Sequence, residues 1–182
     1  RYKKDINNIV TLTLDMANRK VNIINHEIGK AFFPVLEHLK KEKAKGSLRG
    51  VILTSGKKSF LAGGDLDYIF KSGSREEIFD YSQTLKQFFR DLESPGVPVV
   101  AAINGTALGT GFEMALACHH RIVINDPTIR LGHPEASLGM MPGSGGVIRL
   151  MWILGIERAF HILANGQSYY PEEALRAGII DE

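Results

Sequence analysis

The chain lacks most of the features by which secreted and membrane-spanning proteins are recognised. Its 182 residues include a single cysteine, Cys118, which excludes an internal disulfide and fits a reducing compartment. The longest apolar runs, such as residues 99–103, are far too short to cross a bilayer, and the N-terminal residues are charged instead of forming an apolar signal segment. We therefore expect a soluble, cytoplasmic protein that makes no membrane contact.

The chain also lacks a strong charge of one sign. It carries 22 basic and 20 acidic residues, a formal net charge of +2, and its basic residues are spread out apart from the run at 40–45 and the pair Lys57-Lys58. This distribution gives no support for nucleic-acid binding. The run at 40–45 is typical of a solvated helix end, whereas the pair precedes a glycine turn and is a candidate for contact with a ligand phosphate.

Three familiar glycine motifs are missing as well. Gly50 and Gly56 do not complete a Walker A loop, and neither residues 109–111 nor residues 143–145 complete the G-x-G-x-x-G pattern. Pro142 stands where a nucleophile elbow needs its first glycine. We therefore expect no nucleoside triphosphate or NAD site, and we interpret Ser144 as the N-cap of a helix.

The composition, with 44% hydrophobic and 23% charged residues, is that of a single globular domain over residues 1–182. Alternating strand and helix patterns predict an α/β architecture, with ligands bound at the loops that leave the strands. The expected strands are 9–14, 51–54, 99–103 and a pair at 122–124 and 129–131. The expected helices are one that opens at Asn25, one opened by the capping pair Ser74 and Glu77, and short ones at 147–154, 156–164 and 171–177.

Two glycine-rich turns, at residues 62–65 and 108–111, each follow an apolar strand. Glycine lets the backbone approach a ligand closely, so each turn can present a bare N–H group to a ligand oxygen. A pair of such groups would form an oxyanion hole, which polarises a carbonyl and stabilises an enolate. The alternative is that these glycines only permit tight turns between a strand and a helix.

Two glutamates accompany these turns. Glu113 lies among apolar residues on the small-residue helix that follows the second turn, where burial of a carboxylate is costly. Glu135 follows Pro134 and precedes a further glycine-rich stretch at 139–146. Two glutamates beside glycine-shaped turns indicate general acid/base chemistry.

Three segments, residues 59–66, 99–113 and 131–146, resemble the enoyl-CoA hydratase/isomerase (crotonase) family in their order and motifs. Residues 14–22, 164–166 and 174–180 are also similar to the N-terminal hydratase part of multifunctional fatty-acid oxidation proteins. The resemblance implies a spiral of strand-strand-helix units. It also implies that the C-terminal helices of the family, which complete the acyl pocket and contribute to oligomer contacts, are missing from a truncated core domain.

The resemblance implies the reversible hydration of a trans-2-enoyl-CoA in fatty-acid β-oxidation. In this assignment the thioester oxygen is held by the N–H groups of Gly64 and Thr110. Glu113 mainly activates the water, Glu135 passes a proton to Cα, and the N–H of Gly143 holds the water. The coupled carboxylates can share protons, so the division between them is left open.

The remaining implied contacts are with coenzyme A. Ala62, Asp65 and Leu66 would flank its pantetheine or adenine portion, and Lys58 is a candidate for a phosphate contact. The thioester is the substrate, so the implied reaction needs no metal or redox cofactor. His119 and His120 have no suitably spaced partner, and no metal site is predicted.

Several points of the pattern depart from the family or stay open. Thr110 replaces the usual glycine, Gly64 a common alanine and His119 a frequent aspartate. His133 is assigned a packing or hydrogen-bonding role. An enoyl-CoA isomerase using Glu135 alone, and a non-catalytic acyl-CoA-binding or assembly module, are the alternative functions. The expected partners are an acyl-CoA and either further copies of the chain or the rest of a multifunctional fatty-acid oxidation chain.

Overall fold

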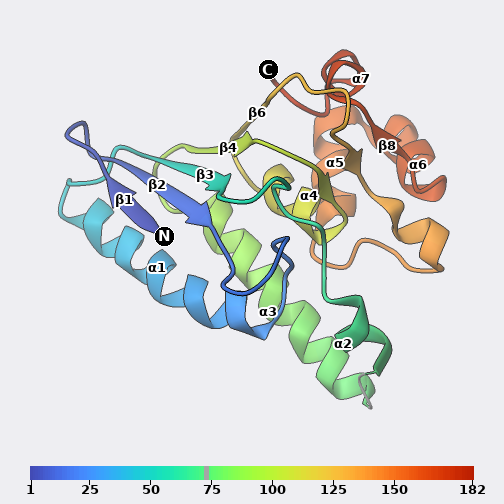
Figure 1. The fold of residues 1–182 in the computed structure, drawn as a ribbon, viewed down its shortest axis with the longest axis horizontal. Coiled ribbons are helices and arrows are strands. Elements are labelled where there is room, and N and C mark those ends of the chain that lie inside the picture. The colour runs from blue at the N-terminus through green and yellow to red at the C-terminus, as the bar shows by residue number, and fades with distance from the viewer. Residues whose placement is uncertain (72–73) are drawn as a thin grey trace.

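The structure is a computed structural model that describes residues 1–71 and 74–182. Its larger sheet has the strand order β1-β2-β3-β4-β6, in which only β1 is antiparallel to its neighbour (Figure 1). The strand bounds are β1 Tyr2–Lys4, β2 Ile9–Leu14, β3 Gly50–Ser55, β4 Val99–Ile103 and β6 His120–Val123. Side chains alternate between buried and half-buried along β2, β3 and β4, so one face of the sheet forms the core.

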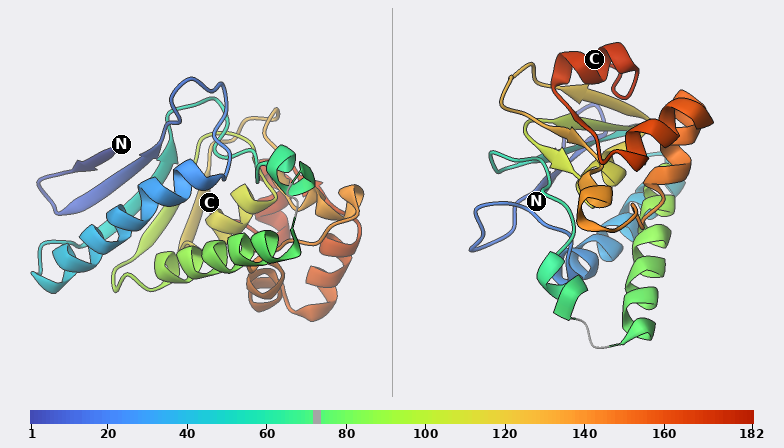
Figure 2. Two further views of the ribbon diagram at one scale, coloured as in Figure 1. Left: turned by 90° about the horizontal axis from the view of Figure 1, so that it is seen from below. Right: turned by 90° about the vertical axis from the view of Figure 1, so that its right-hand side faces the viewer.

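Two long helices cover this buried face (Figure 1, Figure 2). They are α1, His26–Ala44, and α3, Arg75–Glu93, and they meet through the edge-to-face rings of Phe32 and Phe88, whose centroids lie 5.0 Å apart. Both begin where the sequence predicts, because the side chains of Asn25 and Ser74 accept the N–H groups of the residues three positions later. No helix in the described ranges combines the length and apolarity needed to span a membrane.

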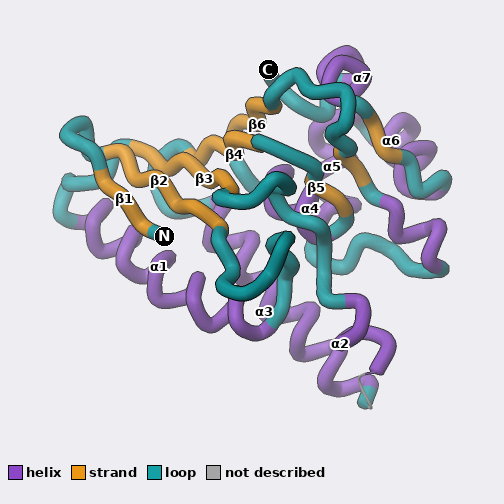
Figure 3. The backbone as a smooth tube through the Cα atoms, in the orientation of Figure 1, coloured by secondary structure: helices purple, strands orange, loops and turns teal. Residues whose placement is uncertain are grey.

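The second half of the molecule is built around a smaller sheet with the order β5-β7-β8. Its strands are β5 Ala107–Leu108, β7 Leu131–Gly132 and β8 Ser168–Tyr169. The helical elements are α2 Leu66–Lys71, α4 Thr110–Leu116, the 3₁₀ helix η1 Pro134–Leu138, α5 Gly146–Leu154, α6 Ile156–Ala164 and α7 Pro171–Ala177. Figure 3 shows α5, α6 and α7 gathered at the end of the molecule away from β1 and β2.

Two local predictions are wrong. Residues 122–124 and 129–131 do not pair with each other, because β6 completes the larger sheet beside β4 while β7 pairs with β5 in the smaller one. Ser144 is not a helix N-cap, because Gly145 takes that position and the N–H of Ser144 is directed to a buried carboxylate. The mixed α/β class and the predicted long helices are confirmed.

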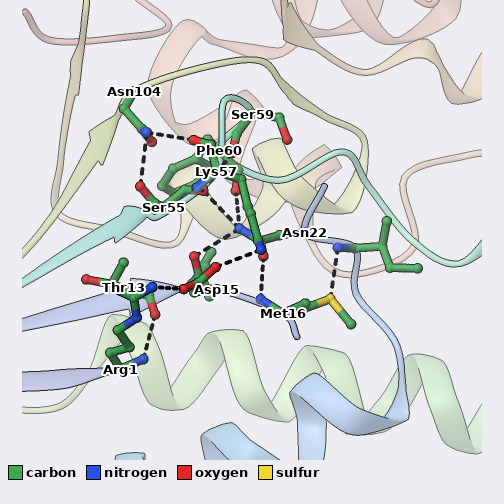
Figure 4. Close-up of polar contacts among 12 residues, drawn as sticks. Arg1, Thr13, Asp15, Met16, Asn22, Ser55, Lys57, Ser59, Phe60 and Asn104 are labelled. Carbon is green, nitrogen blue, oxygen red and sulfur yellow. Dashed lines mark hydrogen bonds and ion pairs between the residues drawn. The ribbon is translucent and has the colours of Figure 1, made fainter. Parts of the chain in front are cut away.

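Asn22 fastens the ends of two strands to the segment that leads into the first glycine turn (Figure 4). Its side chain is fully buried. The amide nitrogen donates to the carbonyl of Leu14 at 3.1 Å, the hydroxyl of Ser55 at 2.9 Å and the carbonyl of Phe60 at 3.3 Å. The amide oxygen accepts the N–H of Met16 at 3.0 Å. One side chain therefore sets the direction in which residues 60–64 leave the sheet.

We expect Asn22→Ala to lower the free energy of unfolding by about 2–4 kcal/mol, because several buried polar groups lose their partner at once. Asn125→Ala is the matched control, since Asn125 is exposed and makes a single long bond of 3.4 Å to Glu172. That variant should change stability by less than about 0.5 kcal/mol. Urea unfolding of both variants checks the expectation, and equal losses would contradict it.

Candidate active site

A mainly apolar cavity of about 450 Å³ lies where the two glycine turns, α3 and the residues around η1 meet. Its size is within the range of small-molecule sites, roughly 300–1,000 Å³. The wall consists of residues 62–64, 66, 69, 78, 81, 82, 85, 108–110, 134, 135, 138, 140, 141, 143 and 144. Only a few polar groups face this space, so a ligand inside it would meet those groups in a medium that strengthens electrostatic contacts.

Two of these polar groups are backbone amides on neighbouring turns. Gly64 lies just before α2, and Thr110 is the first residue of α4. A β-bridge between Leu61 and Ala107 holds the two turns side by side, and a methyl group on Gly64 would lie 3.5 Å from the hydroxyl of Thr110. Within the described residues, neither amide N–H donates to a protein acceptor. Both N–H groups are therefore left to donate to a ligand, and their sharing of one ligand oxygen stays a prediction.

The sharp entry into α4 depends on two glycines. Gly109 has φ = 53°, a left-handed conformation that favours glycine, and a Cβ there would lie 2.8 Å from Oε1 of Glu135. A Cβ on Gly111 would overlap the backbone carbonyl of Leu61. The glycines thus allow close contact with both the carboxylate and the neighbouring turn, and they do more than permit a tight turn.

Glu135 brings a carboxylate to the cavity wall. It is the second residue of η1, which follows His133, and its side chain is about one-tenth exposed. One carboxylate oxygen lies against the backbone of Gly109, next to Thr110, and the other lies 3.6 Å from Nδ1 of His133. The acid is therefore adjacent to the turn that carries one of the free amides.

Glu113 lies behind the wall and is fully buried. Its Oε1 accepts two N–H groups, from Ser144 and Gly146, each at 2.8 Å. Its Oε2 has no hydrogen-bond partner in the described part of the chain. Burial raises the pKa of Glu113; nearby His133 and the two N–H groups oppose the rise, and Glu135 adds to it. The two acids are thus close enough to interact electrostatically.

Most of the residues predicted for the site lie together. The cavity wall includes Ala62, Gly64, Leu66, Thr110, Glu135 and Gly143. Glu113 does not line the cavity, but it is bonded to Ser144, which does. The functional roles assigned to these residues stay predictions.

Two predicted contacts lie outside the wall. The carboxylate of Asp65 accepts the N–H of Tyr68 at 3.2 Å and so begins α2. Lys58 is exposed, lies two residues before the buried Phe60 and is not one of the wall residues. Neither contacts the cavity in this structure, and contact with a bound coenzyme A stays a prediction for both.

Helix α3 contributes to the cavity, which was not predicted from the sequence. Ile78, Tyr81, Ser82 and Leu85 form one side of it, and the hydroxyl of Ser82 donates to the carbonyl of Gly143 at 3.2 Å. Burial raises the pKa of Tyr81 to about 12, and its hydroxyl donates to Ile24 at 3.0 Å. Helical periodicity identifies this apolar face, but it does not distinguish a core contact from a cavity wall.

We expect Glu113→Gln to stabilise the fold increasingly as pH rises. The folded state holds the proton of Glu113 more tightly than the unfolded state, so this group's contribution to stability falls as pH rises from the ordinary carboxyl pKa through the raised one. Each pH unit between the two pKa values corresponds to about 1.4 kcal/mol. Urea unfolding at about pH 5 and about pH 8 measures the effect, with exposed Glu157→Gln as the control. A difference from wild type that is the same at both pH values would contradict the expectation.

The chain is similar in sequence to known subunits of fatty acid oxidation complexes. The chain is 38% identical over 177 residues to the fatty acid oxidation complex subunit alpha of Shewanella loihica, and 38% identical over 175 residues to that of Shewanella halifaxensis. These matches cover 97% and 96% of the chain but 25% and 24% of the relatives. The chain therefore spans about a quarter of the length of the curated relatives it matches.

Solved structures show the same fold. An enoyl-CoA hydratase from Bacillus anthracis superposes with a TM-score of 0.88 at 29% identity, over 99% of this chain and 68% of that one. An enoyl-CoA hydratase from Geobacillus kaustophilus gives a TM-score of 0.89 at 26% identity, over 97% of this chain and 65% of the other. The model of the enoyl-CoA hydratase/isomerase family matches residues 5–182. The chain belongs to the enoyl-CoA hydratase/isomerase family and has the crotonase fold.

Proposed function

We propose that this chain catalyses the reversible hydration of a trans-2-enoyl-CoA to a 3-hydroxyacyl-CoA in fatty-acid β-oxidation. One observation carries the proposal: a glutamate and two backbone amides line a single apolar cavity, and a second glutamate from another element lies directly behind its wall. Glu135 and the amides of Gly64 and Thr110 line it, and Glu113 reaches its wall through Ser144. The family membership and the names of the relatives support the same reaction class.

The amides bind the thioester oxygen in this mechanism. Attack of water on Cβ moves an electron pair through the double bond onto that oxygen and forms an enolate. The N–H groups of Gly64 and Thr110 donate to the developing negative charge. In an apolar site each such donor can lower the barrier by about 3 kcal/mol.

The two acids transfer the protons. Ionised Glu113 accepts a proton as water adds its oxygen to Cβ, with the N–H of Gly143 holding the water in place. Protonated Glu135 donates its proton to Cα as the enolate collapses, which leaves a neutral 3-hydroxyacyl thioester. Transfer of the proton from Glu113 to Glu135 restores the starting state. The burial of Glu113 makes its carboxylate a stronger base than an exposed one.

The coenzyme A portion of the substrate is bound by residues away from the reacting carbons. Ala62, Leu66 and Asp65 flank the pantetheine or adenine portion, and exposed Lys58 contacts a phosphate after the coenzyme has extended across the surface. The reaction itself uses no metal or redox cofactor. We further propose that the chain acts as the hydratase portion of a longer fatty-acid oxidation protein, which forms oligomers.

One observation favours a second candidate, enoyl-CoA isomerisation. Glu135 lines the cavity whereas Glu113 lies behind its wall. A single carboxylate can remove a proton from one carbon and return it to another while the amides hold the dienolate oxygen. Isomerisation without hydration by the full-length protein would favour this activity, and acyl-CoA binding without turnover would indicate a binding or assembly module.

We expect Glu113→Gln and Glu135→Gln each to lower kcat for hydration by about 10²–10⁴-fold with little loss of substrate binding, because each removes a proton-transfer group. The measurement is the absorbance loss of a trans-2-enoyl-CoA on addition of the full-length protein. Glu157→Gln, on the exposed side of α6, is the control and should leave the rate unchanged. Wild-type turnover in either of the two active-site variants would refute the assignment.

We also expect two glycines of the site to respond differently to alanine. Gly64→Ala keeps the amide, and its methyl group would lie at ordinary contact distances of 3.5 Å from Ile69 and Thr110, so kcat/KM should change little. Gly111→Ala would force its methyl group into the backbone of Leu61 and should cost about 1–3 kcal/mol of stability as well as activity. Thermal unfolding and hydration rates check both variants. A large loss of activity in a stable Gly64→Ala protein would count against the amide assignment.

A further inference from the structure

Buried polar atoms without hydrogen-bond partners concentrate at one place. Within residues 1–71 and 74–182 there are six such side-chain atoms, and four of them belong to Glu113, His133 and Glu135. They are Oε2 of each glutamate and both ring nitrogens of the histidine. Buried polar side chains are normally paired, so a group of three unpaired neighbours requires an explanation other than stability. The proposed mechanism uses the glutamates but gives His133 no role.

The ring of His133 is held in place by its surroundings. It is 1% exposed and packs on Phe112, with ring centroids 5.4 Å apart. Its backbone N–H donates to the carbonyl of Gln167 at 3.3 Å. The ring therefore does not depend on hydrogen bonds for its position, and its nitrogens are free to act on neighbouring charges.

The ring lies close to both acids. Its Nδ1 is 3.6 Å from Oε2 of Glu135. A Cβ built on Gly146 would be 2.8 Å from the adjacent ring atom Cε1 and 2.9 Å from Oε1 of Glu113, so the ring also lies close to the second acid. A proton carried by the ring would thus be close to both carboxylates.

The charged groups around the ring are the two acids and an arginine that is already paired. Glu113 faces the ring from α4 and Glu135 from η1. A further cation on a packed element is Arg149 of α5, which bonds Glu93 at 2.6 Å and the carbonyl of Ser144 at 3.0 Å. Its charge is therefore already balanced by Glu93. In the proposed proton transfers the acid pair carries one negative charge throughout, first on Glu113 and then on Glu135, and an imidazolium next to both stabilises that charge at either acid.

We propose that His133 is a positioning residue, whose imidazolium is the shared counter-charge of Glu113 and Glu135 and holds the carboxyl of Glu135 against Gly109, beside the thioester site. This inference rests on the proposed function, because it assigns a task within the same acid/base pair. It adds an electrostatic role to the packing of the ring on Phe112.

A positive charge on His133 would affect the pH dependence of kcat/KM. The charge of His133 lowers the pKa of Glu113 against the effect of burial. Glu113 must be ionised to accept a proton from water, so activity is lost as pH falls through its pKa. Removal of the positive charge raises that pKa, and the acidic limb of the kcat/KM profile must therefore move to higher pH.

The test is the pH profile of kcat/KM for a trans-2-enoyl-CoA in the full-length protein carrying His133→Gln or His133→Leu. We expect both variants to move the acidic limb up by about one pH unit, with KM changed less than kcat. His120→Gln is the matched control, because His120 also pairs with carboxylates, those of Asp181 and Glu182, but lies outside the cavity wall. It should leave the limb in place.

A second measurement does not need turnover. Infrared difference spectroscopy between low and high pH reports the carboxyl band of Glu113, identified as the band that Glu113→Gln removes. We expect its midpoint to rise in His133→Gln. If the wild-type protein does not hydrate the substrate, the proposed function fails while this band still tests His133. An unchanged midpoint, or an unchanged acidic limb in an active and folded His133→Gln protein, overturns the inference.

Discussion

The site depends on two hydrogen bonds, in which the carboxylate of Glu113 accepts backbone N–H groups. It joins α4 to the loop before α5, although the two segments are some thirty positions apart in the sequence. A buried carboxylate is tolerated only with such donors. The backbone must come very close to provide them, and a Cβ on Gly146 would lie 2.7 Å from Cγ of Glu113. The buried acid therefore requires glycine at position 146.

A second support acts on the opposite side of the same loop. Arg149 donates to the carbonyl of Ser144 while its Nε bonds Glu93 at the end of α3. The peptide groups of the loop are thus held through their carbonyl on one side and through their amides on the other. Helix α3 also forms one wall of the cavity. Helices α3 and α5 therefore set both the position of the buried acid and the shape of the pocket.

Much of this arrangement could be predicted from the sequence, and the parts that could not share a physical cause. The long helices follow from periodicity and from the caps at Asn25 and Ser74, and the acids and glycine turns follow from motifs. The pairing of β7 with β5 could not be predicted from the sequence, because strands of two residues have no periodic pattern. The cavity wall on α3 could not be predicted either, since apolar residues have the same helical spacing whether they face the core or a pocket. Both depend on contacts between segments distant in sequence.

The polar groups that are worst for stability are those best placed for chemistry. Within the described residues, Glu113, His133 and Glu135 keep buried atoms without hydrogen-bond partners close to one another, beside a core of apolar side chains. Sequences usually satisfy their buried polar groups, and exceptions concentrate at functional sites. The low polarity that makes these charges costly also strengthens their effect on a substrate in the cavity. The apolar residues on either side of Glu113 in α4 belong to the main core, and their burial offsets the cost of the charge that they surround.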